Sequence, residues 1–142
     1  MGKGKILSIN CSKVKGTAKN PVTSALLIEG VGLDGDAHAA GGLRQVSLLS
    51  IESIRKQEAG AGDFAENITT AGMELSNLKI GDRLRLGNAL IEISQIGKEC
   101  HRRCAIYYKA GNCIMPREGI FAKVINGARI APGDDIEVMG NV

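Results

Sequence analysis

The amino-acid sequence predicts a mostly-β fold, a small closed or partly closed β-barrel with a few short helices. Residues 83–86 alternate between charged and apolar side chains, turn at Gly87-Asn88 and continue as a β-prone run over residues 89–94. This is the pattern of a β-hairpin. Nineteen glycines recur in turn-like pairs, which suits short strands joined by tight turns. Long stretches of helical periodicity are scarce.

Other strands are predicted from short apolar or alternating runs that end in polar or glycine-containing segments. In chain order they are residues 6–11, 25–29, 45–49, 67–70, 120–125 and 136–139. Residues 105–108 fit either a strand or the end of a helix, and the pattern does not decide between them.

One helix is predicted to begin after Ser50, because a serine side chain can accept a hydrogen bond from the first turn of a helix. Glu52 lies in that first turn, where a negative charge is favourable. The helix is expected to cover residues 51–59, two to three turns, and to stop at Gly60 and Gly62.

A sequence pattern that occurs twice in the chain, called the echo below, supports the prediction of a barrel. A hydrophobic residue, a Gly-Asp turn and an alternating strand follow one another around Gly81-Asp82 and again around Gly133-Asp134. Glycine tolerates a positive φ angle and aspartate bonds its own backbone, so such a turn typically opens a strand. The echo is weak evidence of a repeat and better evidence for a mostly-β barrel.

Length and composition indicate one globular domain spanning residues 1–142. The chain is 44% hydrophobic and 23% charged, which is typical of a folded protein rather than a disordered one. No apolar run approaches the roughly 20 residues of a membrane helix, and no signal-like segment follows the N-terminal lysines. We therefore expect no membrane association and a cytoplasmic location, where cysteines are mostly reduced, metal-bound or reactive.

The charge pattern argues against nucleic acid as a partner. The net charge is only +3, and two Phe, two Tyr and no Trp leave little surface for stacking bases. A few local Arg and Lys side chains can still hold an anionic small molecule.

A cluster of chemically active residues marks the C-terminal half. Residues 100–104 are Cys-His-Arg-Arg-Cys, and Cys113 follows, whereas Cys11 stands alone in a predicted strand. Thiolates are nucleophiles and soft-metal ligands, and adjacent cations lower a thiol's pKa.

One function that these residues allow is a zinc-stabilised binding domain, with a closed site of four ligands. Its ligands are Cys100, His101, Cys104 and Cys113. The spacing lacks paired Cys-x2-Cys hooks, and two of the ligands are adjacent in sequence. A thiol redox protein is another possibility, although no Cys-x-x-Cys motif is present.

Several segments together resemble the MOSC domain, the module named for the C-terminal part of molybdenum cofactor sulfurase. They are residues 32–38, 44–49, 62–70, 78–82, 103–106 and 133–136. The likeness covers nearly the whole chain in the expected order. Its most specific part is Glu-Asn-Ile-Thr-Thr at residues 66–70, followed by a Gly-Asp turn and a downstream cysteine. The resemblance implies a compact β-barrel with a few short helices.

The resemblance also implies molybdenum cofactor (molybdopterin) binding or sulfur carriage, in cofactor maturation or a molybdenum-dependent reaction. The family pattern has an arginine directly before the key cysteine, as in Arg103-Cys104, so Cys104 is the expected reactive thiol and molybdenum ligand. Full sulfurases carry a pyridoxal-phosphate domain ahead of this module. No such site is expected in 142 residues, so sulfur would come from a cysteine desulfurase or a cofactor-synthesis enzyme. Whether the chain itself turns over a substrate stays open.

The cofactor-binding residues implied by the resemblance come from several segments. They are Asp36, His38, Arg44, Glu66, Asn67 and Arg103. His38 has either a pocket role or a turn-stabilising role, and Arg44 either holds a phosphate or lies on the surface. Glu66-Asn67 forms either a simple turn or hydrogen bonds to a pterin edge or to the Cys104 loop. We predict that residues 32–38, Arg44, Glu66-Asn67 and Cys104 gather on one rim of the barrel.

Overall fold

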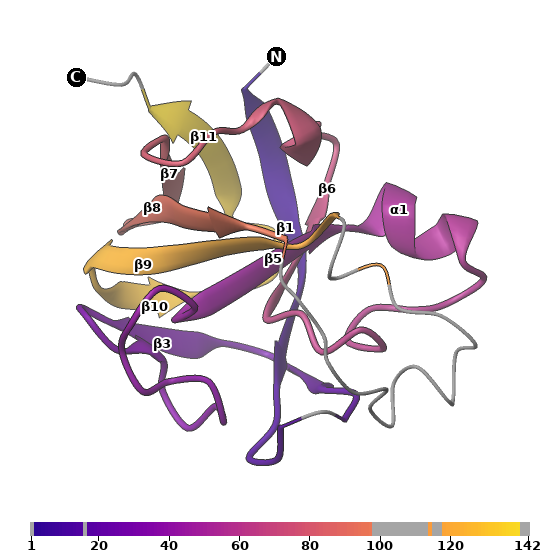
Figure 1. The fold of residues 1–142 in the computed structure, drawn as a ribbon, viewed down its shortest axis with the longest axis horizontal. Coiled ribbons are helices and arrows are strands. Elements are labelled where there is room, and N and C mark those ends of the chain that lie inside the picture. The colour runs from indigo at the N-terminus through magenta and orange to yellow at the C-terminus, as the bar shows by residue number, and fades with distance from the viewer. Residues whose placement is uncertain (1, 16, 98–113, 115–117, 140–142) are drawn as a thin grey trace.

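The computed structural model describes residues 2–15, 17–97, 114 and 118–139. Its strands are β1 (Lys3–Cys11), β2 (Asn20–Val22), β3 (Ala25–Ile28), β4 (Gly32–Leu33), β5 (Val46–Ser50), β6 (Ile68–Ala71), β7 (Arg83–Leu86), β8 (Ala89–Ile96), β9 (Ile120–Asn126), β10 (Ala128–Ile130) and β11 (Asp135–Met139), with the helix α1 (Ile51–Lys56) and the 3-10 turn η1 (Leu75–Asn77). The predicted mostly-β fold is confirmed (Figure 1).

The main sheet closes into a barrel. Its strand order is β11-β7-β8-β9-β5-β6-β1-β2, and β1 also pairs with β11, so that within the described part of the chain seven strands form a ring and β2 extends one side of it. All of the ring's pairings are antiparallel except that of β5 with β6. Closure leaves the ring strands without the unpaired edges of an open sheet. A smaller sheet, β10-β3-β4, lies beside the barrel.

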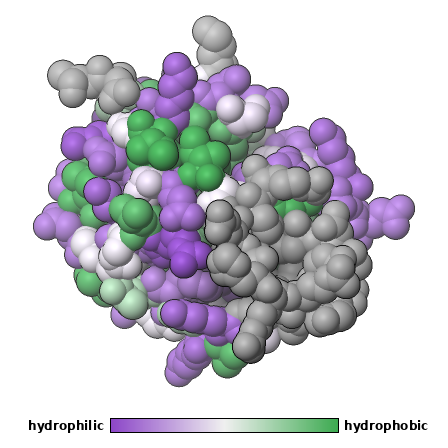
Figure 2. All heavy atoms as spheres, viewed as in Figure 1, coloured by the Kyte–Doolittle hydropathy of each residue, from purple (hydrophilic) through white to green (hydrophobic). Residues whose placement is uncertain are grey.

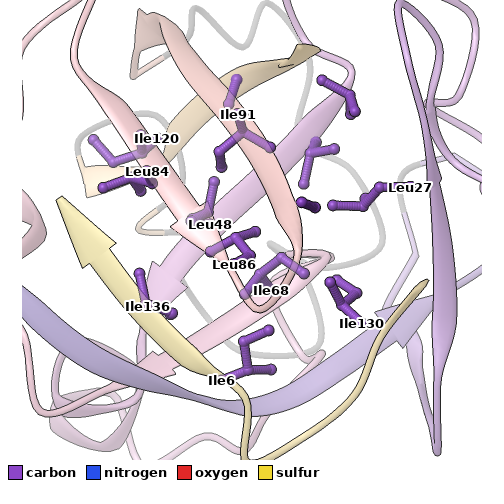
Figure 3. Packing of buried hydrophobic residues seen from close by; sticks show 14 of the residues in the cluster. Ile6, Leu27, Leu48, Ile68, Leu84, Leu86, Ile91, Ile120, Ile130 and Ile136 are labelled. Atoms are coloured by element: carbon purple, nitrogen blue, oxygen red, sulfur yellow. The ribbon is translucent and has the colours of Figure 1, made fainter. Parts of the chain in front are cut away.

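The barrel interior is filled by apolar side chains from alternate strand positions. On β7, for example, Leu84 and Leu86 are buried and the two arginines are exposed, as the side-chain period of two requires. Figure 3 shows side chains of the main core gathered in the interior. Those labelled there are Ile6, Leu27, Leu48, Ile68, Leu84, Leu86, Ile91, Ile120, Ile130 and Ile136.

The predicted hairpin and both predicted Gly-Asp turns are confirmed. Strands β7 and β8 pair from Leu86 opposite Ala89 onward. The carboxylates of Asp82 and Asp134 each accept a hydrogen bond of 2.9 Å from the N–H group three residues earlier. The two echoed segments therefore fold alike, and the strands that they open, β7 and β11, pair with each other.

The helix begins where the sequence predicts and ends sooner. The Ser50 side chain accepts a hydrogen bond from the Ser53 N–H group at 3.1 Å. Helix α1 then ends at Lys56 instead of Ala59, because Glu58 adopts a φ of 55°, a left-handed conformation that cannot continue a right-handed helix. The short elements β2, β4, β10 and η1 were not predicted.

Among the described residues on the face in Figure 2, apolar residues form small groups between polar ones. Among the described residues, the exposed large apolar side chains are Leu7, Val14, Leu26, Leu43, Ile80 and Ile96. Scattered apolar residues of this kind are normal on protein surfaces. Within the described part of the chain, no helix is long and apolar enough to cross a membrane.

Candidate functional site

A buried ion pair lies at the centre of the candidate site. The Lys19 ammonium nitrogen lies 2.6 and 2.8 Å from the two carboxylate oxygens of Asp36, and neither side chain is exposed to solvent. The same carboxylate accepts hydrogen bonds of 3.1 Å from the backbone N–H groups of Ser12 and His38. It therefore joins the end of β1, the segment before β2 and the loop after β4.

Asp36 is held in its charged form. Burial opposes the charge, but the neighbouring His38, Lys19, Ser12 N–H and Asn67 groups outweigh burial and hold the pKa of this carboxyl well below its usual range. A buried carboxylate needs a nearby cation and satisfied lone pairs, and this surrounding provides both.

His38 extends from the buried pair to the surface. Its Nδ1 atom lies 3.0 Å from the Lys19 ammonium nitrogen and 3.6 Å from the nearer Asp36 oxygen. The His38 side chain is 31% exposed, whereas those of Lys19 and Asp36 are fully buried. The imidazole is thus the member of this group that can contact a ligand.

A second polar group braces the barrel beside the first. The Asn67 side-chain oxygen accepts hydrogen bonds from the Ser47 N–H group at 3.0 Å and from its hydroxyl at 3.2 Å. The Asn67 amide donates to the Asn10 carbonyl at 3.3 Å, and Asn67 also helps to lower the pKa of the Asp36 carboxyl. Asn67 therefore connects β1, β5 and the buried ion pair.

Glu66 is buried with one oxygen satisfied and the other unpaired. Its Oε2 atom accepts hydrogen bonds from the Gly62 N–H group at 2.8 Å and the Thr69 hydroxyl at 2.6 Å. The Asn10 amide in turn donates to that hydroxyl and to the Glu66 carbonyl. Oε1 has no hydrogen-bond partner within the described residues, and burial raises the pKa of the Glu66 carboxyl. This environment favours the neutral acid.

A close backbone approach brings Lys19 to the site. Gly62 has a φ of 84°, and a Cβ atom there would lie 2.2 Å from the Lys19 carbonyl oxygen. The Lys19 N–H group donates to the Gly62 carbonyl at 2.8 Å. Only glycine fits both the conformation and the contact, so the segment before Glu66 docks directly against the lysine backbone.

Cys11 lies next to this polar group and packs partly against the main core. Burial, then the nearby Asp36 carboxylate, raises the pKa of its thiol, against the opposing effect of Lys19. The Cys11 side chain is half-buried, so it lies at the margin of the core and not inside it.

The predicted convergence can be compared with the structure for some of its members. Asp36 and His38 lie together with Asn67, and Glu66 joins them through Asn10. Arg44 is exposed. Arg103 and Cys104 lie outside the described residues, as do the other proposed zinc ligands Cys100, His101 and Cys113.

Four buried polar residues of the site were not predicted from the sequence: Lys19, Asn10, Ser47 and Thr69. Lysine and short polar residues in strand-like segments ordinarily lie on the surface, so composition gives no sign that these are buried. The available signal was the position of Asn10 and Ser47 directly beside apolar residues of two predicted strands.

Two cavities lie elsewhere on the described part of the molecule. They measure about 190 and 360 Å³ and share Glu74 and Leu78 in their linings. Neither is lined by Asp36 or His38, so both are separate from the buried ion pair.

Comparisons with known proteins place the chain in a family. The uncharacterized protein YflK of Bacillus subtilis is 24% identical over 155 residues, covering 98% of this chain and 70% of its own. The crystal structure of the YuaD protein from Bacillus subtilis matches with a TM-score of 0.77 at 21% identity, over 96% of this chain and 95% of that one. YiiM from Geobacillus stearothermophilus matches with a TM-score of 0.76 at 22% identity, over 96% and 75%. These structures support the fold, and the family model of the MOSC domain matches residues 35–137. The chain therefore belongs to the MOSC domain family.

Proposed function

We propose that this chain binds the molybdenum cofactor and ligates its metal, or carries its sulfur, through the Cys104 thiol. The observation that carries the proposal is the family match over residues 35–137, which includes Cys104 and the Asp36 to Asn67 segments. MOSC domains are associated with molybdenum cofactor enzymes. A thiolate is a soft, polarisable donor of the kind that such a metal accepts.

The described residues fit an anionic pterin at the surface. His38 and Arg44 reach solvent, and both side chains can donate hydrogen bonds to a phosphate or another oxygen-rich group. The bound cofactor would supply the redox-active metal and its dithiolene sulfurs. In the proposal Cys104 ligates the metal, Arg103 favours the thiolate, and His38 and Arg44 orient the anionic part.

The buried members of the predicted site have a different role in this proposal. Asp36, Glu66 and Asn67 are buried and bonded to the chain itself. We assign them to holding the loops in place rather than to direct cofactor contact. Their burial supports this assignment, because a fully enclosed side chain can reach a ligand only if the surrounding chain opens.

The experiment is purification from cells that synthesise the cofactor, followed by measurement of bound molybdopterin and of persulfide on each cysteine by mass spectrometry. The wild-type chain is expected to carry molybdopterin or a persulfide on Cys104, whereas Cys104→Ser is expected to carry no persulfide at this position and less molybdopterin. Cys11→Ser is the matched control and should load normally. Wild-type protein with one tightly held zinc and no pterin or persulfide would overturn the proposal in favour of the zinc-stabilised domain.

A further inference from the structure

The contacts of Lys19 determine which nitrogen of His38 carries a proton. An ammonium group has three hydrogens and no lone pair, so it donates and never accepts. Its three short contacts are the two Asp36 oxygens, at 2.6 and 2.8 Å, and His38 Nδ1, at 3.0 Å. His38 Nδ1 must therefore accept a hydrogen bond. A nitrogen that accepts carries no proton, so the proton of the neutral ring is on Nε2.

The alternative is an Nδ1–H group that donates to Asp36, as in the usual carboxylate–histidine pair. The distance from Nδ1 to the nearer Asp36 oxygen is 3.6 Å, which is too long for a normal hydrogen bond of about 2.7–3.2 Å. That oxygen already accepts from the Lys19 ammonium group and from the His38 backbone N–H group. The direct hydrogen bond to the ring therefore comes from Lys19, which Asp36 holds in place.

We propose that Lys19 is a positioning residue: with Asp36 it fixes His38 as the Nε2–H tautomer and makes its exposed edge a hydrogen-bond donor. The His38 side chain is 31% exposed and its Nδ1 contacts the fully buried lysine, so we assign the exposed part to the opposite edge of the ring, which carries Nε2. Such a donor fits an oxyanion or an oxo group, such as a phosphate, and does not fit an ammonium or another N–H group. The identity of the ligand rests on the proposed function, whereas the tautomer does not.

The first test uses the wild-type chain without cofactor. Nitrogen-15 NMR of the imidazole rings distinguishes a protonated ring nitrogen from an unprotonated one. The chain has two histidines, so a His101→Gln variant assigns the signals. At neutral pH the proposal predicts an unprotonated Nδ1 and a protonated Nε2 for His38. A protonated Nδ1, or averaging between the two tautomers, would overturn it.

The second test removes both charges of the buried pair. In Lys19→Met/Asp36→Asn the asparagine oxygen keeps one backbone N–H group satisfied, and no unpaired charge stays buried. With the backbone spectrum still native, the His38 signals should average between tautomers. Lys5→Met/Asp135→Asn is the matched control, because this exposed pair has the same 2.6 Å separation, and it should leave the His38 signals unchanged. A folded double variant that keeps the single Nε2–H tautomer would contradict the role of Lys19.

Cofactor loading separates this inference from the proposed function. If the cofactor binds, removal of the donor in His38→Leu should lower its affinity about tenfold. The double variant, in which only part of the molecules keep the Nε2–H tautomer, should lower the affinity by a smaller factor. Unchanged affinity in both variants would refute the donor role. A wild-type chain that shows the predicted tautomer but never carries molybdopterin would refute the proposed function and leave the positioning role supported.

Discussion

Replacing Lys19 by methionine should destabilise the chain strongly, because it leaves the buried Asp36 carboxylate without its cation. Both side chains are fully shielded from solvent, and breaking a buried ion pair in this way costs about 3–5 kcal/mol. The remaining hydrogen bonds to the carboxylate, from Ser12 and His38, favour the lower end, about 3 kcal/mol. At about 4 °C per kcal/mol for a domain of this size, Tm should fall by about 12 °C.

The exposed pair Lys5–Asp135 provides a control with the same chemistry. Its nitrogen and oxygen are also 2.6 Å apart, but the side chains are 64% and 80% exposed. Solvent and salt screen such a pair, so Lys5→Met should change stability far less than Lys19→Met. The comparison isolates burial as the cause, since the separation and the charges are equal.

The assay is urea unfolding of wild type, Lys19→Met and Lys5→Met at several pH values. The folded pKa of Asp36 lies below its unfolded value of about 3.9. Its contribution to wild-type stability is therefore fully present above that pH and is lost as the pH falls. The difference in unfolding free energy between wild type and Lys19→Met should be largest near pH 7 and shrink below about pH 4. Equal effects of the two lysine substitutions, or a difference independent of pH, would refute the buried-pair account.

Three further predictions concern the surrounding residues. In urea titrations, Gly62→Ala should lower the unfolding free energy well beyond the loss caused by Gly72→Ala. Both glycines have a positive φ, a conformation that costs about 1–2 kcal/mol for alanine. Of the two, Gly62 is the one where the new Cβ would meet backbone, at 2.2 Å from the Lys19 carbonyl oxygen. Equal losses would contradict the close approach. Glu66→Gln should weaken the decline of stability above about pH 4.3. Burial raises the pKa of the Glu66 carboxyl, so the folded wild type loses stability as this group ionises. An unchanged pH profile of the unfolding free energy in Glu66→Gln would contradict a buried Glu66 with a raised pKa. Cys11 should react with iodoacetamide at neutral pH more slowly than Cys104, since its thiol pKa is raised, and peptide mass spectrometry would expose the reverse order.

Local signals in the sequence were sufficient for the elements that local interactions form. The Gly87 turn with its alternating flanks predicts the β7–β8 hairpin, and Ser50 predicts the start of α1, because each depends on neighbours a few residues away. Closure of the barrel is different. It depends on pairing Lys3–Lys5 with Asp135–Glu137 at opposite ends of the chain, which no local pattern specifies.

The candidate site divides in the same way. The polar motifs around Asp36 and Glu66-Asn67 interrupt apolar runs, so their placement together could be predicted from the sequence. The burial of Lys19 could not, because it depends on one carboxylate 17 residues away and on the approach of the Gly62 backbone. Nor does sequence alone show that Glu66 and Asn67 are buried, since that depends on how β6, which follows them, pairs with β1 and β5.

The most direct test of the central claim is X-ray absorption at the molybdenum edge, on wild type and Cys104→Ser purified from cofactor-producing cells. The cofactor itself supplies dithiolene sulfurs to both proteins, so any further sulfur ligand must come from elsewhere. If Cys104 ligates the metal, wild type should show one more sulfur around molybdenum than Cys104→Ser retains. The same number of sulfur ligands in both proteins, with equal molybdenum content, would contradict the assignment of Cys104 as the metal ligand.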